Sequence, residues 1–416
     1  MKNRILGGAI GSAALFLQGR SPGQLVVQYT DRCNAACPQC GMRAKEGFAR
    51  STLSVDEVKR MIDAAAARNV KCFSITGGEP MIYREEVTKL LGYARKAGIP
   101  FTRTGTNGFL FMNHTRPGFE KRVGELAREL LEAGVYTFWI SLDSAVPSVH
   151  EQMRGLPGVW EGIRKAIPVF RKEGLYPAAN LGINRNTGGM PVQAETDEEL
   201  SGQFRVAFAR FYSSVIDLGF TITNACYPMS EGPRDAVYRA TGSGDIVNFT
   251  PGERRAVYRA LFDTVKEYRD RIRIFTPLSS LYALINREVE TEVEYPCRGG
   301  IDYFFVSASD GDAYPCGYRA AENLGKFWDL QPSRDDEKAC ARCDWECFRD
   351  PSELLGPFMQ VSRHPLKVAG RWMKDKVLFR IWLDDLRYYY ACDFFCAHVA
   401  ADHRKLSGFG ARRDMR

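Results

Sequence analysis

Short runs of β-branched and aromatic residues alternate along the chain with longer runs in which apolar residues recur at helical spacing. The short runs predict six β-strands, over residues 24–30, 71–76, 101–106, 136–143, 177–184 and 220–225. Each is followed by a predicted helix, over about 54–68, 84–97, 121–133, 159–173, 198–218 and 251–269. The first helix opens on Ser54 with Glu57 three residues later, the pattern of a capping box. Strand–helix units in regular order favour parallel strands with right-handed crossovers. The pattern therefore predicts an α/β protein built on a partial (βα)6 barrel, open on one side.

The segments that follow these strands carry the unusual residues of the chain. In β/α barrels, chemistry gathers at the carboxyl ends of the strands. The residues at those ends are Cys33–Cys40, Gly77–Pro80, Thr106–Gly108, Ser141–Asp143, Asn184–Asn186 and Cys226. The sequence thus places a candidate site at one mouth of the barrel.

The cysteines indicate ligand chemistry. There are 12 of them among 416 residues, in clusters rather than as a dispersed set, so metal or cluster binding in a reducing compartment is favoured over disulfides. Cys33, Cys37 and Cys40 lie within eight positions. Three thiolates are one too few to close a structural zinc site, which leaves a fourth ligand position to be explained.

The two ends of the chain have distinctive patterns of their own. An apolar run over Ile5–Leu17 lacks a convincing signal-peptide cleavage site and is too short to span a bilayer. It predicts an apolar N-terminal helix, either packed on the body or lying at a membrane interface. From Val361 to Arg416 there are 12 Lys+Arg against 6 Asp+Glu, together with many aromatic residues. A helix docked on the core is favoured there over contact with an anionic membrane. No recognised motif indicates nucleic-acid binding.

The spacing Cys33-x3-Cys37-x2-Cys40, directly after the first predicted strand, resembles that of the radical S-adenosylmethionine (SAM) superfamily. The resemblance implies that the three cysteines hold three irons of a [4Fe–4S] cluster and leave one iron open. In the family, the amino and carboxylate groups of SAM occupy the open position, which would account for the fourth ligand.

Motifs at the ends of later strands match the same family. They are TGGEP at residues 76–80, TNG at 106–108, ISLDS at 140–144 and MRG at 153–155. By this resemblance, the expected SAM-binding residues are Gly77, Gly78, Glu79, Asn107, Ser141, Asp143 and Asn186. Arg154 can equally be a structural salt-bridge partner. The family commonly has an aromatic residue before the third cysteine, where this chain has Gln39, so another residue such as Met42 or Phe48 is expected near the adenine.

The region after the barrel resembles the SPASM or twitch extension of this family, in which a β-hairpin bears cysteines. A hairpin turn is predicted at Asp310-Gly311. The resemblance implies at least one auxiliary [4Fe–4S] cluster with ligands among Cys297, Cys316, Cys340, Cys343 and Cys347, and leaves open a second through Cys392 and Cys396. A zinc ribbon is the alternative, and Cys72 and Cys226 are not expected to be ligands. The expected domains are an N-terminal helix over 1–23, the barrel over 24–290, a small C-terminal β-hairpin iron–sulfur domain over 291–350 and a basic aromatic helical segment over 351–416.

The resemblance also implies a reaction. A low-potential electron donor such as flavodoxin or ferredoxin would reduce the first cluster, and SAM would split into methionine and a 5′-deoxyadenosyl radical that abstracts hydrogen from an unactivated carbon. An auxiliary cluster favours net oxidation, hence an oxidoreductase. The apolar termini favour a hydrophobic or membrane-associated small-molecule substrate, of lipid or tetrapyrrole type. Peptide or protein maturation is the alternative, and a non-catalytic iron–sulfur or zinc protein is the second. A cytoplasmic protein is expected, with peripheral membrane contact left open.

Overall fold

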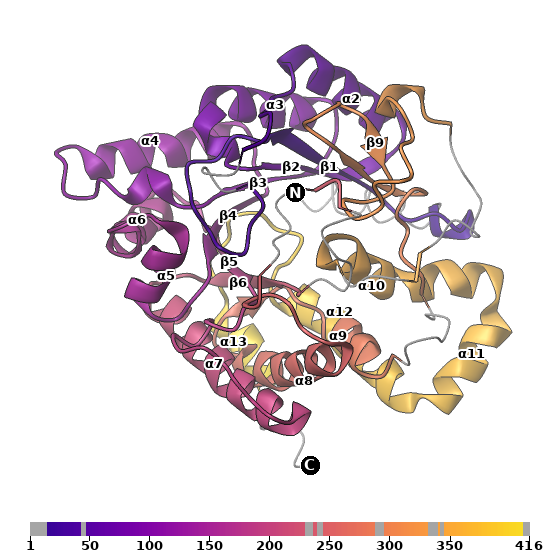
Figure 1. Ribbon diagram of the computed structural model, residues 1–416. Helices are drawn as coiled ribbons and strands as arrows, with labels where there is room; N and C mark the ends of the chain where they lie inside the picture. The colour runs from indigo at the N-terminus through magenta and orange to yellow at the C-terminus, as the bar shows by residue number, and fades with distance from the viewer. Residues whose placement is uncertain are drawn as a thin grey trace.

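The computed structural model describes residues 15–42, 47–228, 236–238, 244–287, 295–331, 340–341 and 345–410. Within them, nine strands form one curved sheet in the order β7-β6-β5-β4-β3-β2-β1-β8-β9 (Figure 1). The strands are β1 (Gly23–Thr30), β2 (Val70–Gly77), β3 (Phe101–Thr106), β4 (Thr137–Leu142), β5 (Ala178–Gly182), β6 (Ile222–Cys226), β7 (Arg273–Ile274), β8 (Tyr303–Val306) and β9 (Ala313–Tyr314). The first six are the predicted strands, and neighbours among them pair in parallel. The predicted partial (βα)6 barrel is confirmed.

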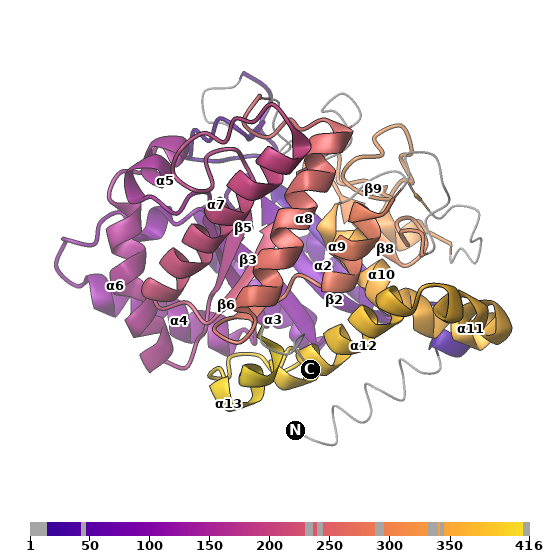
Figure 2. The same cartoon turned by 90° about the horizontal axis from the view of Figure 1, so that it is seen from below.

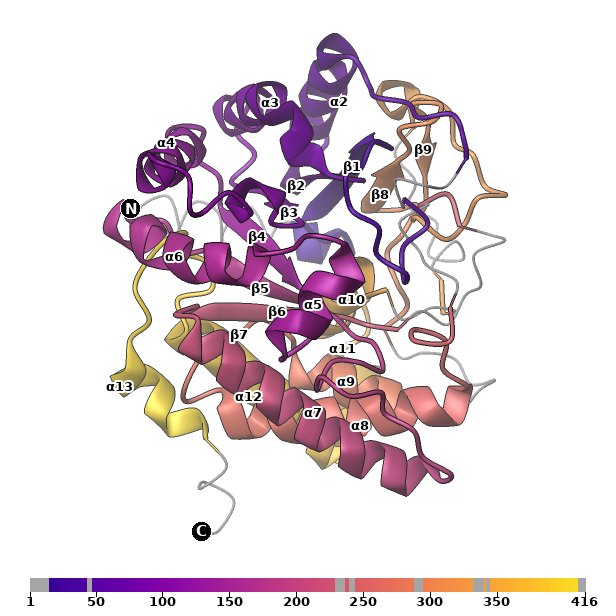
Figure 3. The ribbon, with the colours of Figure 1, turned by 60° about the vertical axis from the view of Figure 1, so that its left-hand side comes forward.

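The predicted helices cover the outside of the sheet. They are α2 (Val55–Ala67), α3 (Arg84–Lys96), α4 (Phe119–Glu132), α6 (Val159–Lys172), α7 (Asp197–Asp217) and α8 (Pro251–Tyr268). Figure 3 shows α3, α4, α6 and α7 outside the strands. The capping box at Ser54 and Glu57 is present, as predicted. Two shorter helices, α5 (Pro147–Arg154) and α9 (Leu278–Ile285), follow β4 and β7.

Side chains along the strands alternate between the helix layer and the inside of the barrel. Those beneath the helices are apolar and fully buried, as Leu25, Phe73 and Phe138 are. Those that face inward are largely polar, and they include Gln24, Ser74, Thr76, Arg103, Ser141, Asn180 and Asn224. A closed β/α barrel fills its interior with layers of branched apolar side chains. Here the interior is instead a cavity, into which these polar side chains project among aromatic ones such as Phe101 and Trp139.

The predicted hairpin is present, and it continues the barrel sheet. Its two strands pair antiparallel through Phe305↔Tyr314 and Val306↔Ala313, and Gly311 in the turn has a φ of +68°, which glycine adopts readily. β8 also pairs in parallel with β1, from Gln24↔Tyr303 to Val27↔Val306. This pairing satisfies the edge of β1, which would otherwise present unpaired backbone groups. The hairpin therefore shares the barrel's sheet, and a domain boundary near residue 291 stays a prediction.

The C-terminal helices pack on the barrel, as predicted for a docked segment. They are α10 (Glu346–Arg363), α11 (Pro365–Lys374), α12 (Lys376–Ala391) and α13 (His403–Leu406), and Figure 2 shows them along one end of the molecule. The Tyr388 hydroxyl donates toward Ile272 O and accepts from Ile274 N, which ties α12 to β7. None of the described helices has the length and hydropathy needed to cross a bilayer.

The predicted N-terminal helix lies largely outside the described residues, which begin at residue 15. Residues 15–17 are helical. The Phe16 ring stacks on Phe358 of α10 with 5.4 Å between the ring centroids, and Ser362 Oγ donates to Phe16 O at 2.6 Å. The described part of this segment is thus packed on the body of the protein.

Candidate active site

The loop after β1 carries three cysteines at the carboxyl end of the sheet. Cys40 N donates to Cys37 O at 3.1 Å, and Ala36 N donates to Arg154 O at 3.0 Å, which fixes the loop against α5. Backbone amides also donate to sulfur, from Ala35 N to Cys33 Sγ at 3.5 Å and from Met42 N to Cys40 Sγ at 3.4 Å. Such donors stabilise thiolates, so the loop is suited to hold an anionic cluster.

Burial favours the protonated form of the thiols in this loop. Burial raises the pKa of Cys37 to about 12 and that of Cys40 to about 11, and it also raises the pKa of Cys33. Arg154 opposes these shifts because its positive charge favours the thiolates. A bound metal deprotonates its thiol ligands outright, so formation of a cluster here releases protons.

Gly77 and Gly78 allow the end of β2 to approach the cysteine loop. Gly78 N donates to Thr30 O at 2.7 Å, and Glu79 N donates to Arg32 O at 2.8 Å. A Cβ at Gly77 would lie 2.5 Å from Thr30 O, and one at Gly78 would lie 2.3 Å from Arg32 O and 3.0 Å from Cys33 Cβ. The glycine pair is therefore required for the position of the loop itself.

Replacing Gly78 with alanine should displace the cysteine loop, because the added Cβ meets backbone rather than a movable side chain. We expect anaerobically reconstituted Gly78→Ala protein to lose the iron held by that loop while keeping its fold. Iron per chain and far-ultraviolet circular dichroism measure the two effects. Gly202→Ala on α7 is the matched control, since nothing lies within 4 Å of its added Cβ. Full iron content in the Gly78 variant would contradict this role.

Glu79 and Asn107 connect the ends of β2 and β3. The Glu79 carboxylate accepts from Asn107 N at 2.6 Å and from Met81 N at 3.1 Å. Burial raises its pKa to about 7, against these two donors. Asn107 Nδ2 donates to Asn34 Oδ1 in the cysteine loop at 2.8 Å and lies 3.9 Å from Cys33 Sγ. Both predicted site residues thus lie beside the cysteine loop.

The end of β4 places a buried ion pair beneath the cysteines. Arg154 Nη2 lies 2.9 Å from Asp143 Oδ1, and both side chains are buried. Arg154 is therefore a salt-bridge partner, which was one of the two roles considered for it from the sequence. His150 Nδ1 accepts from Asp143 N at 3.2 Å, and burial lowers the pKa of His150 to about 3. Asp143 Oδ2, His150 Nε2 and Arg154 Nε are buried without a hydrogen-bond partner. Of these three residues Arg154 lines the cavity, so its unpaired Nε fits a site that holds a polar cofactor.

The remaining predicted contacts divide between the cavity and the layer behind it. Ser141 lines the cavity with Gly77, Gly78, Glu79 and Asn107. Asp143 and Asn186 are not among the described residues that line it. Asn186 O instead accepts from Ser144 Oγ at 2.8 Å. The SAM-binding roles of these residues stay predictions.

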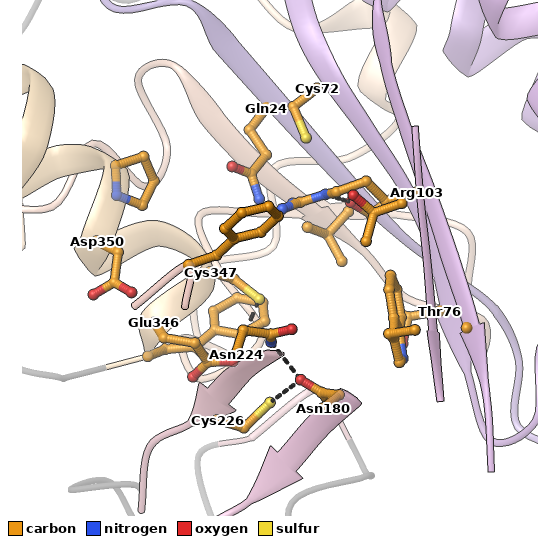
Figure 4. Close-up of a pocket in the computed structure, with 18 of the residues that line it drawn as sticks. Gln24, Cys72, Thr76, Arg103, Asn180, Asn224, Cys226, Glu346, Cys347 and Asp350 are labelled. Atoms are coloured by element: carbon orange, nitrogen blue, oxygen red, sulfur yellow. Dashed lines mark hydrogen bonds between the residues drawn. The ribbon is translucent and has the colours of Figure 1, made fainter. Parts of the chain in front are cut away.

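A cavity of about 1860 Å³ runs from the cysteine loop down the inside of the barrel. At the cysteine end it is lined by Cys33, Cys37, Gln39 and Cys40, and at the other by Lys71, Phe101, Tyr136 and Phe394. Between these two ends, the indole of Trp139 lies over Gly105 of β3. Only glycine leaves room for the ring at this position, because a Cβ on residue 105 would lie 2.1 Å from Trp139 Nε1. Residues from α10, including Glu346, Cys347 and Asp350, close the side that the six-stranded barrel leaves open (Figure 4).

Apart from Ser141, the inward-facing polar residues of the strands were not predicted as site residues. Arg103, Asn180, Asn224 and Gln24 line the middle of the cavity (Figure 4). Asn224 Nδ2 donates to Asn180 Oδ1 at 2.5 Å, and Cys226 Sγ lies 3.4 Å from the same oxygen. Their signal in the sequence is a polar residue at alternate positions of each strand, on the face opposite the apolar residues.

The cysteines of the hairpin region fall into two groups. The backbones of Cys297 and Cys340 exchange hydrogen bonds of 2.8 and 3.1 Å. Burial raises the pKa of Cys316 to about 12, and the neighbouring Cys297 and Cys340 thiols add to the shift. Cys347 instead lines the barrel cavity, where its Sγ lies 3.6 Å from Glu346 Oε1 (Figure 4). Cys343 lies outside the described residues.

Comparison with known proteins gives three findings. The family model described as "Radical SAM superfamily" matches residues 27–201. An AdoMet-dependent heme synthase of Methanosarcina barkeri is 25% identical over 358 residues, 81% of this chain and 87% of that protein. A GTP 3′,8-cyclase of Rhizobium etli is 26% identical over 316 residues, 73% and 81% of the two chains.

A solved structure has a similar fold. The structure of Streptococcus suis SuiB bound to precursor peptide SuiA has a TM-score of 0.50 and 16% identity, over 79% of this chain and 68% of that one. Identity at this level shows the fold alone. The family match covers the cysteine loop, the glycine pair and the ends of β3 and β4. Residues 27–201, which carry the cysteine loop and the strand ends beside it, therefore match the radical SAM superfamily.

Proposed function

We propose that this protein uses SAM to abstract hydrogen from an unactivated carbon of a small molecule held inside the barrel. The observation that carries the proposal is that the three-cysteine loop opens onto the same cavity as the inward-facing polar residues of β1 to β6. A cofactor at the loop and a substrate in the barrel would therefore share one enclosed space. Enclosure excludes water and competing reactions from the reacting atoms.

Superfamily members use SAM and a [4Fe–4S] cluster, and the residues present fit both. When bound and reduced, these cofactors supply a 5′-deoxyadenosyl radical for hydrogen abstraction. Cys33, Cys37 and Cys40 would hold the cluster. Ser141 and Asn107 are placed to orient SAM at the cysteine end of the cavity. A low-potential donor such as flavodoxin or ferredoxin supplies the electron.

The substrate class we favour is an amphipathic small molecule of the tetrapyrrole type. The cavity exceeds the ~300–1,000 Å³ of ordinary small-molecule sites, so it has room for a cofactor and a large substrate. Aromatic walls at Phe101, Trp139 and Phe275 suit a flat conjugated ring. Of the relatives named above, the one aligned over the largest part of this chain is a heme synthase. Maturation of a peptide or protein is the alternative.

The test is an anaerobic assay with reconstituted protein, dithionite, SAM and the iron complex of coproporphyrin III. We expect porphyrin-stimulated formation of 5′-deoxyadenosine and a change in porphyrin mass. An unchanged porphyrin would remove the tetrapyrrole proposal and make peptide maturation the next candidate. A protein that binds iron but never forms 5′-deoxyadenosine would be the non-catalytic alternative.

We also propose an auxiliary cluster at the grouped thiols Cys297, Cys316 and Cys340, which would accept the electron of a product radical and make the reaction a net oxidation. Reconstituted wild type should then contain about eight irons per chain, as two [4Fe–4S] clusters require. Replacing the three cysteines with alanine should lower this to about four, measured by iron and sulfide assays. About twelve irons in the wild type would add a third cluster, with Cys392 and Cys396 as candidate ligands. An unchanged iron content in the variant would contradict the assignment.

Peripheral contact with an anionic membrane is proposed for the surface of α11 and the start of α12. Leu366, Met373 and Val377 there are 88%, 70% and 53% exposed, beside Lys367, Lys374 and Lys376. Apolar insertion and attraction to anionic lipid reinforce one another, at about 1 kcal/mol for each lysine near the surface. We expect co-sedimentation with anionic vesicles at low salt, weakened when the three apolar residues are replaced by glutamine. Met190→Gln, at an exposed methionine outside this surface, is the control. Absence of wild-type binding would contradict the proposal.

A further inference from the structure

Arg103 brings a positive charge into the middle of the barrel. It lies on β3 with its side chain in the cavity (Figure 4). Arg103 Nε donates to Ser74 Oγ at 2.9 Å. No described carboxylate lies within ion-pair distance of its guanidinium, and no described acceptor other than Ser74 Oγ takes a hydrogen bond from it. The terminal nitrogens of Arg103 are therefore free to bind a ligand.

A second donor in the same part of the cavity lacks a partner. Gln24 is 5% exposed, and its Nε2 is buried without a hydrogen-bond partner. Figure 4 shows the Gln24 and Arg103 side chains directed into the same space. A buried polar group without a partner is costly, so the Gln24 amide beside the terminal nitrogens of Arg103 indicates that a ligand completes this part of the cavity.

The carboxyl groups across the cavity are engaged elsewhere. Glu346 accepts from Tyr227 N at 3.3 Å and lies 3.6 Å from Cys347 Sγ. Asp350 accepts from the Tyr227 hydroxyl at 3.1 Å. Both lie on α10, on the wall opposite β3 (Figure 4). Neither is an ion-pair partner of Arg103 in the described structure, although the Glu346 carboxyl lies near enough to favour the charged guanidinium. The terminal nitrogens of Arg103 therefore keep room for an anionic ligand.

We infer that Arg103, assisted by Gln24, binds a carboxylate of the substrate deep in the barrel. This inference rests on the proposed function and names the group by which the substrate is recognised. A planar guanidinium pairs with a carboxylate through two parallel hydrogen bonds, which fixes orientation as well as position. The site offers one guanidinium and one amide, a donor set that matches a carboxylate.

The position of Arg103 also sets the direction in which the substrate lies. Arg103 is three residues before Thr106, where β3 ends at the cysteine side of the cavity. At about 3.3 Å per strand residue, this separation is roughly 10 Å. The anchored carboxylate would therefore lie deeper in the barrel than the cysteine loop, which orients the molecule along the barrel.

The test compares acids with their esters. Binding of coproporphyrin III and its tetramethyl ester, and of dodecanedioic acid and its dimethyl ester, is measured by fluorescence quenching and by thermal shift. Of the two acids, the one that wild type binds more tightly should bind about 10- to 100-fold more tightly than its own ester. This is the gain in affinity expected from one charge-assisted hydrogen-bonded pair. Arg103→Gln should remove this preference, and Arg103→Lys should restore part of it. Lys71→Gln, which removes a positive charge from the far rim of the same cavity, should leave the preference unchanged.

The outcomes separate the anchor from the proposed reaction. Absence of any acid preference in the wild type, or its persistence in Arg103→Gln, overturns the inference. Circular dichroism checks that the variants fold. If wild type prefers dodecanedioic acid to its ester, loses that preference in Arg103→Gln and shows none for coproporphyrin III, then Arg103 binds a carboxylate and the tetrapyrrole proposal fails.

Discussion

Replacing Cys33, Cys37 and Cys40 together with alanine is expected to abolish the formation of 5′-deoxyadenosine. These are the three cysteines of the loop on β1, and Arg154, Asn107 and the backbone amides of that loop are arranged around their sulfurs. Without them, the first cluster has no thiolate ligands. The measurement is chromatographic assay of 5′-deoxyadenosine with SAM and dithionite, together with iron per chain.

Iron at the C-terminal cysteines should survive this change, at about four per chain. Cys396→Ala is the control, because this residue lies at the end of the cavity away from the cysteine loop and should leave SAM cleavage intact. Undiminished cleavage in the triple variant would show that the radical chemistry does not depend on this loop. Loss of all iron would show instead that the two groups of cysteines do not load independently.

Asp385→Ala should lower the free energy of unfolding by about 3–5 kcal/mol, the cost of breaking a buried ion pair on one side. Asp385 on α12 pairs with Arg269 at 2.7 Å, and both side chains are buried. Its carboxylate also accepts from Leu278 N, and from Ser279 N and Oγ, at the start of α9. The substitution leaves the Arg269 charge buried without its partner, and it removes the acceptor for the first turn of α9.

Asp384→Ala is the matched control for this prediction. Its side chain is 52% exposed and pairs with Arg387 three residues later, a surface interaction worth about 0–1 kcal/mol. Denaturant unfolding followed by circular dichroism compares the two variants. Equal, small effects would mean that α12 is attached to the barrel chiefly by its aromatic residues, such as Tyr388 and Tyr389, rather than by the ion pair.

Docking of the C-terminal helices has a consequence for the site. Tyr389, Phe394 and Cys396 line one end of the cavity, and α10 lines its side. The segment that the charge pattern favoured as a docked helix is therefore part of the wall of the active-site cavity. The three apolar residues proposed for membrane contact lie on α11 and α12, close to this end of the barrel (Figure 2).

The features that the sequence determined by itself are local ones. The six strands and their helices follow from the periodicity of apolar residues within short runs of the sequence. The cysteine loop lies within eight positions, and the glycine pair follows directly after β2. Because each of these signals is contained in one short segment, the barrel, the superfamily and its cofactors could be predicted, and the fold and the family match confirm them.

The tertiary structure decided which residues from distant segments meet. Alternation shows that Gln24 and Arg103 lie on one face of their strands, but it does not show whether that face is a packed core or a cavity. That depends on the closure of the barrel by β8 and α10, which come two hundred or more residues later. The pairing of Arg269 with Asp385 and the place of Cys347 beside Glu346 likewise have no local signal. Contacts of this kind depend on how strands and helices pack, and packing is a property of the whole chain.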